Sequence, residues 1–358
     1  MTTRERFRSV LHWERPDRVP NMEFGYWRKT LEVWRGQGLP AGCATNAGVE
    51  RHLGLEGISI IPTLPVHNGA WPAFAEETIE VRGDRRIVRN EDGVLCEMTD
   101  SDSSIPRYLR YTIESKADWE RLKRERLDPE APGRVGDFAA VVSEARTAGL
   151  PVRFNAGSLY GWIRNWMGLE AFSVALLTER TWVEDMMEHL TLLSLSLIEA
   201  ALPGAGADVA WWWEDMAYNH GPLLSPRLFD ELMVPRYKRI TAALRRAGID
   251  TNVLDCDGRI DALVPGWLEA GINVMFPVEA IHSDPYRLSR ARGDRLLMIG
   301  GVDKTAQIAG RAAIDREVER LRPLVERGGY IPCVDHRVPP DVRYADYLYY
   351  LEKKARIL

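Results

Sequence analysis

The chain has 358 residues, of which 45% are hydrophobic and 28% are charged. This length and balance fit one large domain or two ordinary ones, and they exclude disordered, collagen-like and coiled-coil proteins. The net charge is -5, with 47 basic and 52 acidic residues interleaved. We therefore expect no basic face for nucleic acid or for an anionic membrane, and a small molecule as the partner.

The chain shows no stretch of the roughly 20 apolar residues that a membrane span needs, and its first residues lack the apolar segment of a secretion signal. These features predict a cytoplasmic protein. The cysteines lie far apart without a Cys-x-x-Cys pair, at Cys43, Cys96, Cys256 and Cys333. This spacing predicts reduced thiols rather than a disulfide framework or a zinc ribbon.

Short runs rich in valine and isoleucine alternate with longer amphipathic segments. Eight such runs cover residues 18–24, 57–61, 152–156, 208–213, 251–254, 272–276, 295–299 and 330–334. Helices are expected between the later runs, over residues 225–246, 259–270, 284–292 and 314–327. The alternation predicts an α/β fold with a parallel sheet, and the uninterrupted apolar runs favour a closed (β/α)8 TIM barrel over an open sheet.

Residues 62–113 break this alternation. Segments that begin at Glu80 and Glu91 predict antiparallel ribbons with Gly-Asp and Asp-Gly turns. About 50 residues of hairpin bury little by themselves. We therefore expect one domain over residues 1–358, with a β-hairpin excursion after the second strand that lies over the barrel mouth.

Acidic side chains follow most of the predicted strands, at the ends where a barrel carries its chemistry. They are Glu23, Glu214, Asp215, Asp255, Asp257, Glu279, Asp303 and Asp335. So many carboxylates on one rim repel one another unless they are protonated, paired with a basic residue or neutralised by a cation.

Asp255 and Asp257 are two residues apart, so extended backbone points both carboxylates to one side, and Gly258 then permits a turn. Such a pair can ligate a divalent cation, share a proton for acid–base catalysis or hold a cationic ligand. Alternatively, Asp257 caps a helix that begins at Arg259.

His336 follows the last predicted strand, where it is either a functional residue or a hydrogen-bonded loop residue. If the fifth and eighth strands face each other, Asp255, Asp257 and His336 can form a metal site. Glu214 or water would be the fourth ligand, and the set suits zinc or a harder cation.

A turn of small residues runs from Asn155 through Ser158 and Tyr160 to Arg164. Its backbone N–H groups can bind a carboxylate or phosphate that Arg164 pairs, although a tight loop needs such residues in any case. In the run 211–213, at least one indole faces the barrel interior and another the helices. Core packing accounts for two of these indoles, and Trp213 at the mouth is a candidate to shape a flat or apolar substrate site.

Four segments in order carry a family resemblance. They are Thr-Arg-Glu-Arg-Phe-Arg with Pro-Asp-Arg-Val-Pro near the N-terminus, the segment 214–226 that contains Tyr218, Gly-Gly-Val-Asp-Lys around Asp303, and Gly-Gly-Tyr-Ile with Val-Pro-Pro near the C-terminus. Together they resemble the uroporphyrinogen decarboxylase superfamily over nearly the whole chain. The resemblance implies a TIM barrel and either haem-pathway decarboxylase or corrinoid-linked methyltransferase activity.

The sequence departs from both branches. The decarboxylases carry Arg-Gln-Ala-Gly-Arg-Tyr after the first strand to hold the substrate carboxylates, and this chain has Glu23-Phe-Gly-Tyr-Trp-Arg there. An acidic rim also repels a porphyrinogen. In the thiol-methylating branch, zinc is bound by His-x-Cys and a later Cys, to which Asp255, Asp257 and His336 correspond here. This harder ligand set argues against a thiol acceptor.

The leading hypothesis is therefore methyl transfer from a small methoxylated or methylated compound to a corrinoid on a carrier protein that meets the barrel mouth. Asp255, Asp257 and His336 would hold a divalent metal or protonate the leaving oxygen or nitrogen, with Glu214 and Asp215 beside them. Substrate contacts would come from Asn155, Ser158, Tyr160, Arg164, Trp213, Tyr218, Asp303 and Glu23. The alternatives are a decarboxylase acting on a carboxylic acid, and a corrinoid or tetrapyrrole binder without turnover; a homodimer is common in the family that the chain resembles.

Overall fold

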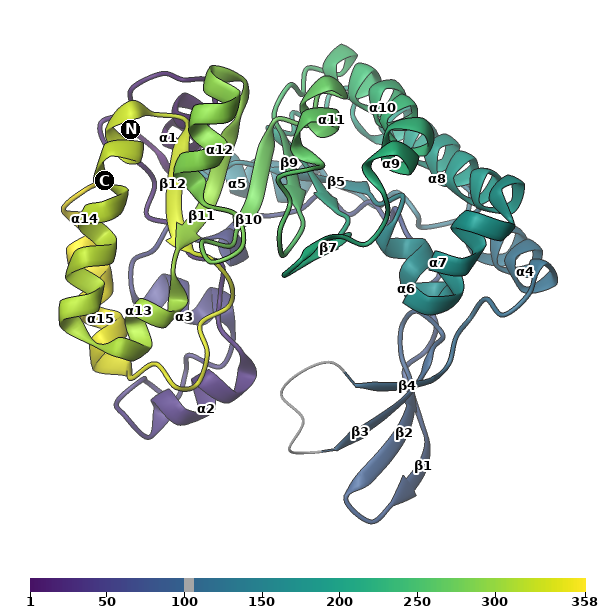
Figure 1. The fold of residues 1–358 in the computed structure, drawn as a ribbon, viewed down its shortest axis with the longest axis horizontal. Helices are drawn as coiled ribbons and strands as arrows, with labels where there is room; N and C mark the ends of the chain where they lie inside the picture. Colours follow the sequence, from purple (N-terminus) through teal and green to yellow (C-terminus); the bar gives the residue numbers. More distant parts are fainter. Residues whose placement is uncertain (100–105) are drawn as a thin grey trace.

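The computed structural model describes residues 1–99 and 106–358. Its centre is a parallel sheet in the order β12-β11-β10-β9-β6-β5 (Figure 1). The six strands are β5 (Arg153–Gly157), β6 (Val209–Trp213), β9 (Asn252–Asp255), β10 (Val274–Val278), β11 (Leu297–Val302) and β12 (Tyr330–Val334). Each strand falls on one of the predicted runs, so the parallel α/β sheet is confirmed.

The first two predicted strands are wrong. Residues 18–24 contain no strand, and residues 57–61 contain the short 3-10 helix η1 (Ile58–Ile60). Pro20 lacks a backbone donor. The amide of Asn21 donates to the carboxylate of Glu56 (2.9 Å), so it is not available for a strand ladder.

The edges of the parallel sheet contact these N-terminal regions through isolated bridges. Tyr26 pairs with Val338 beyond β12, and Thr63 pairs with Arg153 in β5. Within residues 1–99 and 106–358 the structure therefore shows a six-stranded parallel sheet, and it does not show eight strands closed into a barrel.

Helices separate the parallel strands. The N-terminal half contains α1 (Thr3–Leu11), α2 (Arg28–Arg35), α3 (Asn46–His52), α4 (Lys116–Arg126), α5 (Ala139–Thr147), α6 (Gly161–Met167), α7 (Leu169–Thr178) and α8 (Arg180–Ala201). The C-terminal half contains α9 (Pro226–Leu232), α10 (Val234–Arg246), α11 (Val264–Glu269), α12 (Pro285–Arg292), η2 (Gly293–Arg295), α13 (Lys304–Ala309), α14 (Arg311–Arg327) and α15 (Tyr344–Ala355). Side chains cap two of these helices: Ser225 accepts from the Leu228 amide (3.2 Å) at the start of α9, and Asp284 accepts from the Tyr286 amide (3.0 Å) at the start of α12.

Antiparallel ribbons form where they were expected from the turn residues. β1 (Glu77–Arg82), β2 (Arg85–Arg89), β3 (Leu95–Thr99) and β4 (Arg107–Arg110) make a sheet in that order. Figure 1 shows this sheet extending away from the parallel sheet and its helices, so most of it does not cover the strand ends. The sheet reaches the body at the turn between β2 and β3, where Asn165 of α6 donates to Asp92 (3.1 Å), and at Tyr108 of β4, which lines a cavity together with residues of α7.

The core lies between the parallel sheet and its helices. Trp212 is fully buried, packs edge-on against Tyr237 of α10 (5.5 Å between ring centroids) and donates to Asn252. All four cysteines are buried free thiols, as predicted. No helix in the described part of the chain is long and apolar enough to cross a membrane.

Candidate functional site

Asp255 is the last residue of β9, in the middle of the parallel sheet. It is in register with Trp213 of β6 on one side and Phe276 of β10 on the other. Because residues in register on parallel strands point to the same face, the carboxyl group lies between an indole and a phenyl ring.

These surroundings favour the protonated form of Asp255. Burial raises its pKa well above the ordinary value, and the nearby carboxylates of Asp257 and Asp215 raise it further. The positive charges of Arg337 and Arg153 act in the opposite direction but do not outweigh these effects. A carboxyl group whose pKa is shifted in this direction is suited to donate a proton.

His336 and Asp257 come together across the sheet, as the sequence suggested for a shared site. His336 Nε2 lies 3.4 Å from Asp257 Oδ2. The imidazole also contacts the ring of Phe24 edge-on (5.4 Å) and the ring of Trp27 (5.5 Å). The histidine–carboxylate pair is thus bordered by two aromatic rings.

Gly258 fixes the turn that presents Asp257. Its φ is +83°, and a Cβ there would lie 2.7 Å from the backbone of Tyr218. Its amide donates to Glu279 (2.6 Å). Asp257 is not a helix cap, because the following helix begins only at Val264.

The residues predicted as metal ligands do not form a ligand set in this arrangement. Among the described residues, no three His, Cys, Asp or Glu side chains come together in a group that could hold a metal ion. Zinc needs at least three protein ligands around one point. The contact between Asp257 and His336, together with the raised pKa of Asp255, fits acid–base chemistry better than metal binding.

Glu214 corrects the predicted anion site at the start of α6. Its buried carboxylate accepts from the Ser158 hydroxyl (2.8 Å), from Tyr237 (2.7 Å), and from the amides of Leu159 (2.8 Å), Tyr160 (2.7 Å) and Gly161 (3.2 Å). The donors that we expected to hold a substrate anion are thus satisfied inside the protein. The Ser158 hydroxyl and the Tyr160 amide therefore stabilise the fold. Burial raises the pKa of Glu214 even though these hydrogen bonds lower it.

Arg164 is likewise engaged within the protein. It donates to Asp215 Oδ2 (2.7 Å) and to the Asp215 carbonyl, and its guanidinium lies over the Trp213 ring, 5.4 Å from the centroid. Asp215 adopts a left-handed φ of +43°, which costs a non-glycine residue of order 1 kcal/mol. The ion pair stabilises this turn and reduces the charge that Arg164 can offer to a substrate carboxylate.

Two other predicted substrate residues are structural. Glu23 is buried, pairs with Lys354, and accepts from Tyr350 (2.9 Å) and from the Val334 amide (3.1 Å). Asp303 caps α13 by accepting from the Thr305 amide (2.8 Å). Tyr218 is exposed beside the site, in the two-residue strand β7 (Ala217–Tyr218) that pairs with β8 (Gly221–Pro222).

Lys304 is a residue that the sequence analysis missed. Its Nζ lies 3.3 Å from Glu279 and 3.4 Å from Asp335. Burial raises the pKa of Asp335 to about 6 although Lys304 opposes this. The position of Lys304 directly after Asp303, at a strand end rich in acids, was the available signal for this pairing.

A cavity of about 550 Å³ opens beside the ends of β5 and β6, and we call it the tryptophan cavity. Asn155 and Trp213, both predicted, line it. The lining residues that the sequence analysis missed include Trp71, Trp162, His67, Asn165 and Asp92. They come from the excursion and from α6, whose positions around the sheet cannot be read from strand periodicity.

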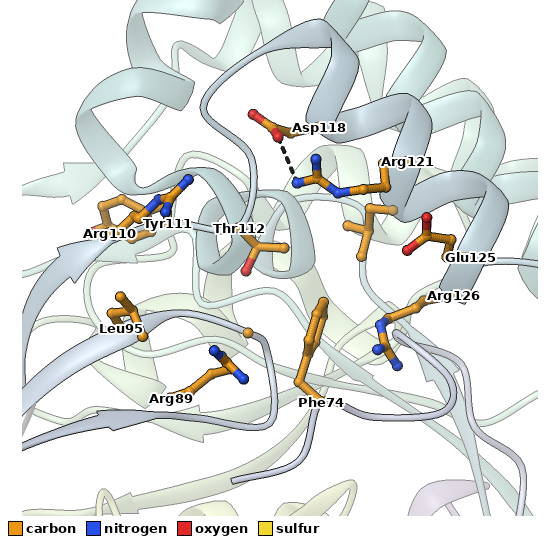
Figure 2. Close-up of a pocket in the computed structure, with 12 residues that line it drawn as sticks. Phe74, Arg89, Leu95, Arg110, Tyr111, Thr112, Asp118, Arg121, Glu125 and Arg126 are labelled. Atoms are coloured by element: carbon orange, nitrogen blue, oxygen red, sulfur yellow. Dashed lines mark hydrogen bonds and ion pairs between the residues drawn. The ribbon is translucent and has the colours of Figure 1, made fainter. Parts of the chain in front are cut away.

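A second cavity, of about 220 Å³, lies between the antiparallel sheet and α4 (Figure 2). Figure 2 shows Arg89, Arg121 and Arg126 around it, with Arg121 bound to Asp118 (2.7 Å). Arg89 pairs with Glu77 (2.9 Å), and Arg126 lies over Phe74. It lies away from the strand ends and from Asp255, so we do not assign the chemistry to it.

Comparisons with known proteins identify the family. No curated protein matches the chain. Among 33 similar chains of solved structures, a methyltransferase from Methanosarcina mazei has a TM-score of 0.65 at 15% identity, over 100% of this chain and 98% of that chain; at this identity the likeness establishes a shared fold. The sequence profile of "Uroporphyrinogen decarboxylase (URO-D)" matches residues 91–352. Because this match covers well over half of the chain, the protein belongs to the URO-D family.

Proposed function

We propose that this protein is an enzyme that transfers a methyl group from a small methylated or methoxylated compound. The observation that carries the proposal is Asp255, a carboxylic acid with a raised pKa at the end of a central strand. The fold shared with a methyltransferase supports this branch of the family over decarboxylation. The acceptor would be a corrinoid on a carrier protein, which supplies the electron pair that takes the methyl group.

Asp255 acts on the atom that the methyl group leaves. When the bond from carbon to an ether oxygen or to a neutral amine nitrogen breaks, its electrons remain on the leaving atom, which then needs a proton. Asp255 supplies that proton, a contribution of about 10²–10⁴ in rate for a well-placed acid. A quaternary ammonium nitrogen leaves as a neutral amine and needs no proton. Asp257, whose charge acts on Asp255, and its partner His336 would pass a proton from solvent back to Asp255 between turnovers.

The arrangement of these side chains does not support a protein-bound metal in this reaction. Of the three predicted ligands, only Asp257 and His336 approach each other closely. The chemistry proposed here rests on the side chains themselves.

The test is single-turnover methyl transfer from a panel of methyl ethers and methylamines to cob(I)alamin, followed by its visible spectrum. Asp255→Ala should abolish transfer. The matched control is Asp250→Ala, at the opposite end of the same strand, where the carboxylate is exposed and contacts His12; it should retain transfer. Full activity of Asp255→Ala, with an unchanged fold, would refute the assignment.

Decarboxylation is the second candidate, because the family profile bears that name. It requires a cation for the substrate carboxylate, and Arg164 is already paired with Asp215. Release of CO2 from a candidate acid in the absence of any corrinoid would favour this reaction. Tight corrinoid binding without turnover of any donor would favour a binding protein instead.

A further inference from the structure

The tryptophan cavity is built largely from aromatic faces. Trp71, Trp162 and Trp213 line it, and each of these side chains is partly exposed. The rings of Trp162 and Trp213 lie 5.4 Å apart at 51°, and His67 stacks on Trp71 at 3.6 Å. Three indoles from separate segments thus face one space of about 550 Å³.

The charge of this cavity is negative. Of the thirteen lining residues, Glu91 and Asp92 are acidic, and none is lysine or arginine. Burial and nearby Arg134 lower the pKa of His67, so its imidazole is neutral at pH 7. The cavity therefore offers no positive charge to bind an anion.

Trp213, which lines the cavity, lies beside the end of β9. Trp213 and Asp255 are in register on adjacent strands, which places their backbones about 4.8 Å apart. The charges of Asp257 and Asp215 raise the pKa of Asp255 there, and those of Arg337 and Arg153 lower it. The guanidinium of Arg164 lies over the Trp213 ring and is paired with Asp215.

We propose that the tryptophan cavity binds a methylated ammonium group, with Trp213 and Trp162 against its methyl groups and with Asp92 balancing its charge. Indole faces attract such cations, and cages of aromatic residues with a nearby carboxylate are a recurrent solution for quaternary ammonium ligands. Asn165, which also lines the cavity, holds the Asp92 carboxylate by donating to it (3.1 Å). That this ligand is the methyl donor rests on the proposed function.

The charge of the ligand is tested with two molecules of the same shape. Choline and 3,3-dimethylbutan-1-ol differ at one atom, a positively charged nitrogen in place of carbon. Isothermal titration calorimetry of the full-length protein should give at least tenfold tighter binding of choline. Equal or tighter binding of the neutral alcohol, or of 4-methoxybenzoate, overturns the proposal.

Variants locate the site. Trp213→Leu should weaken choline binding about 3- to 30-fold, the range expected for one indole–cation contact. The affinity of Trp213→Phe should lie between those of the wild type and of Trp213→Leu. Trp182→Leu is the matched control, because this partly buried indole lies outside the cavity. Asp92→Asn, which keeps the shape of the side chain, should also weaken choline binding. Unchanged affinity in both Trp213→Leu and Asp92→Asn would refute the location.

Binding without a corrinoid separates this inference from the proposed function. Choline binding that depends on Trp213, with no methyl transfer from any donor, supports the site and rejects the enzymatic role. Methyl transfer from a neutral ether, with no choline binding, supports the enzyme and rejects the ammonium site.

Discussion

Removal of the Lys354 ammonium should destabilise the whole domain, because this group neutralises a carboxylate inside the core. The side chains of Lys354 and Glu23 are 1% and 0% exposed. Lys354 also donates to the carbonyl of Met22 (2.8 Å). Lys354→Met keeps most of the side-chain volume but leaves Glu23 charged and without a counter-ion.

The expected loss in the free energy of unfolding is about 3–5 kcal/mol, the usual cost of breaking a buried ion pair on one side. We expect the lower part of that range, because Glu23 keeps its bonds from Tyr350 and from the Val334 amide. For a chain of 358 residues, an unfolding entropy of about 2.1 cal/mol/K per residue gives roughly 0.75 kcal/mol per degree, so 3 kcal/mol lowers Tm by about 4 °C.

Urea unfolding followed by circular dichroism measures this change. Lys353→Met is the control, since the neighbouring lysine on the same helix pairs with Asp315 at the surface and its removal should leave the midpoint almost unchanged. The double variant Glu23→Gln/Lys354→Met should recover much of the loss. Equal stability of Lys354→Met and the wild type would show that Glu23 is not held as described and would restore it as a candidate substrate residue.

Three further outcomes follow from the site and its supports. Methyl transfer should decline as the pH rises through the raised pKa of Asp255, because only the protonated acid donates; Asp255→Asn should lower kcat about 10²–10⁴-fold, and a rate of this variant close to that of the wild type would contradict proton donation. Gly258→Ala should lower the free energy of unfolding by about 1–2 kcal/mol because of the positive φ at this position, and by more because of the clash with Tyr218. Gly248 has a φ of +89° and open space around it. In the same urea assay, Gly248→Ala should therefore lose only the roughly 1–2 kcal/mol due to the positive φ. Burial raises the pKa of Glu50 from 4.5 to about 7, so the folded state binds more protons than the unfolded state and wild-type stability should fall between about pH 4.5 and 7, by roughly 2–3 kcal/mol; Glu50→Gln should remove this fall, and a parallel pH profile in the variant would refute it.

The sequence predicted the parallel sheet because buried strands such as β9 and β12 are continuous apolar runs between helices. It failed at residues 18–24, where Pro20 and the carboxylate of Glu56 disrupt a ladder that the apolar pattern alone suggested. Such side-chain bonds to backbone amides join residues far apart in the chain, and periodicity carries no information about them.

The sequence likewise predicted one part of the site and failed at another. The spacing of Asp255 and Asp257 and the position of His336 predicted a shared site at the strand ends, and the structure brings the side chains of Asp257 and His336 into contact. We expected the donors at the start of α6 to bind a ligand, because the sequence predicted Glu214 as a free carboxylate at the rim of a barrel. Its five bonds become visible only when β6 and α6 are placed side by side.

The carboxylate of Glu214 occupies the place that a bound acid would take, so the protein carries a permanent surrogate ligand on its own chain. Exchange of this one side chain for glycine would vacate the pocket and leave a ring of donors without an acceptor. Added acetate or formate would then be expected to refill it. A single substitution at Glu214 would thus create a binding site for small carboxylic acids, which the side chain of Glu214 itself fills in the wild type.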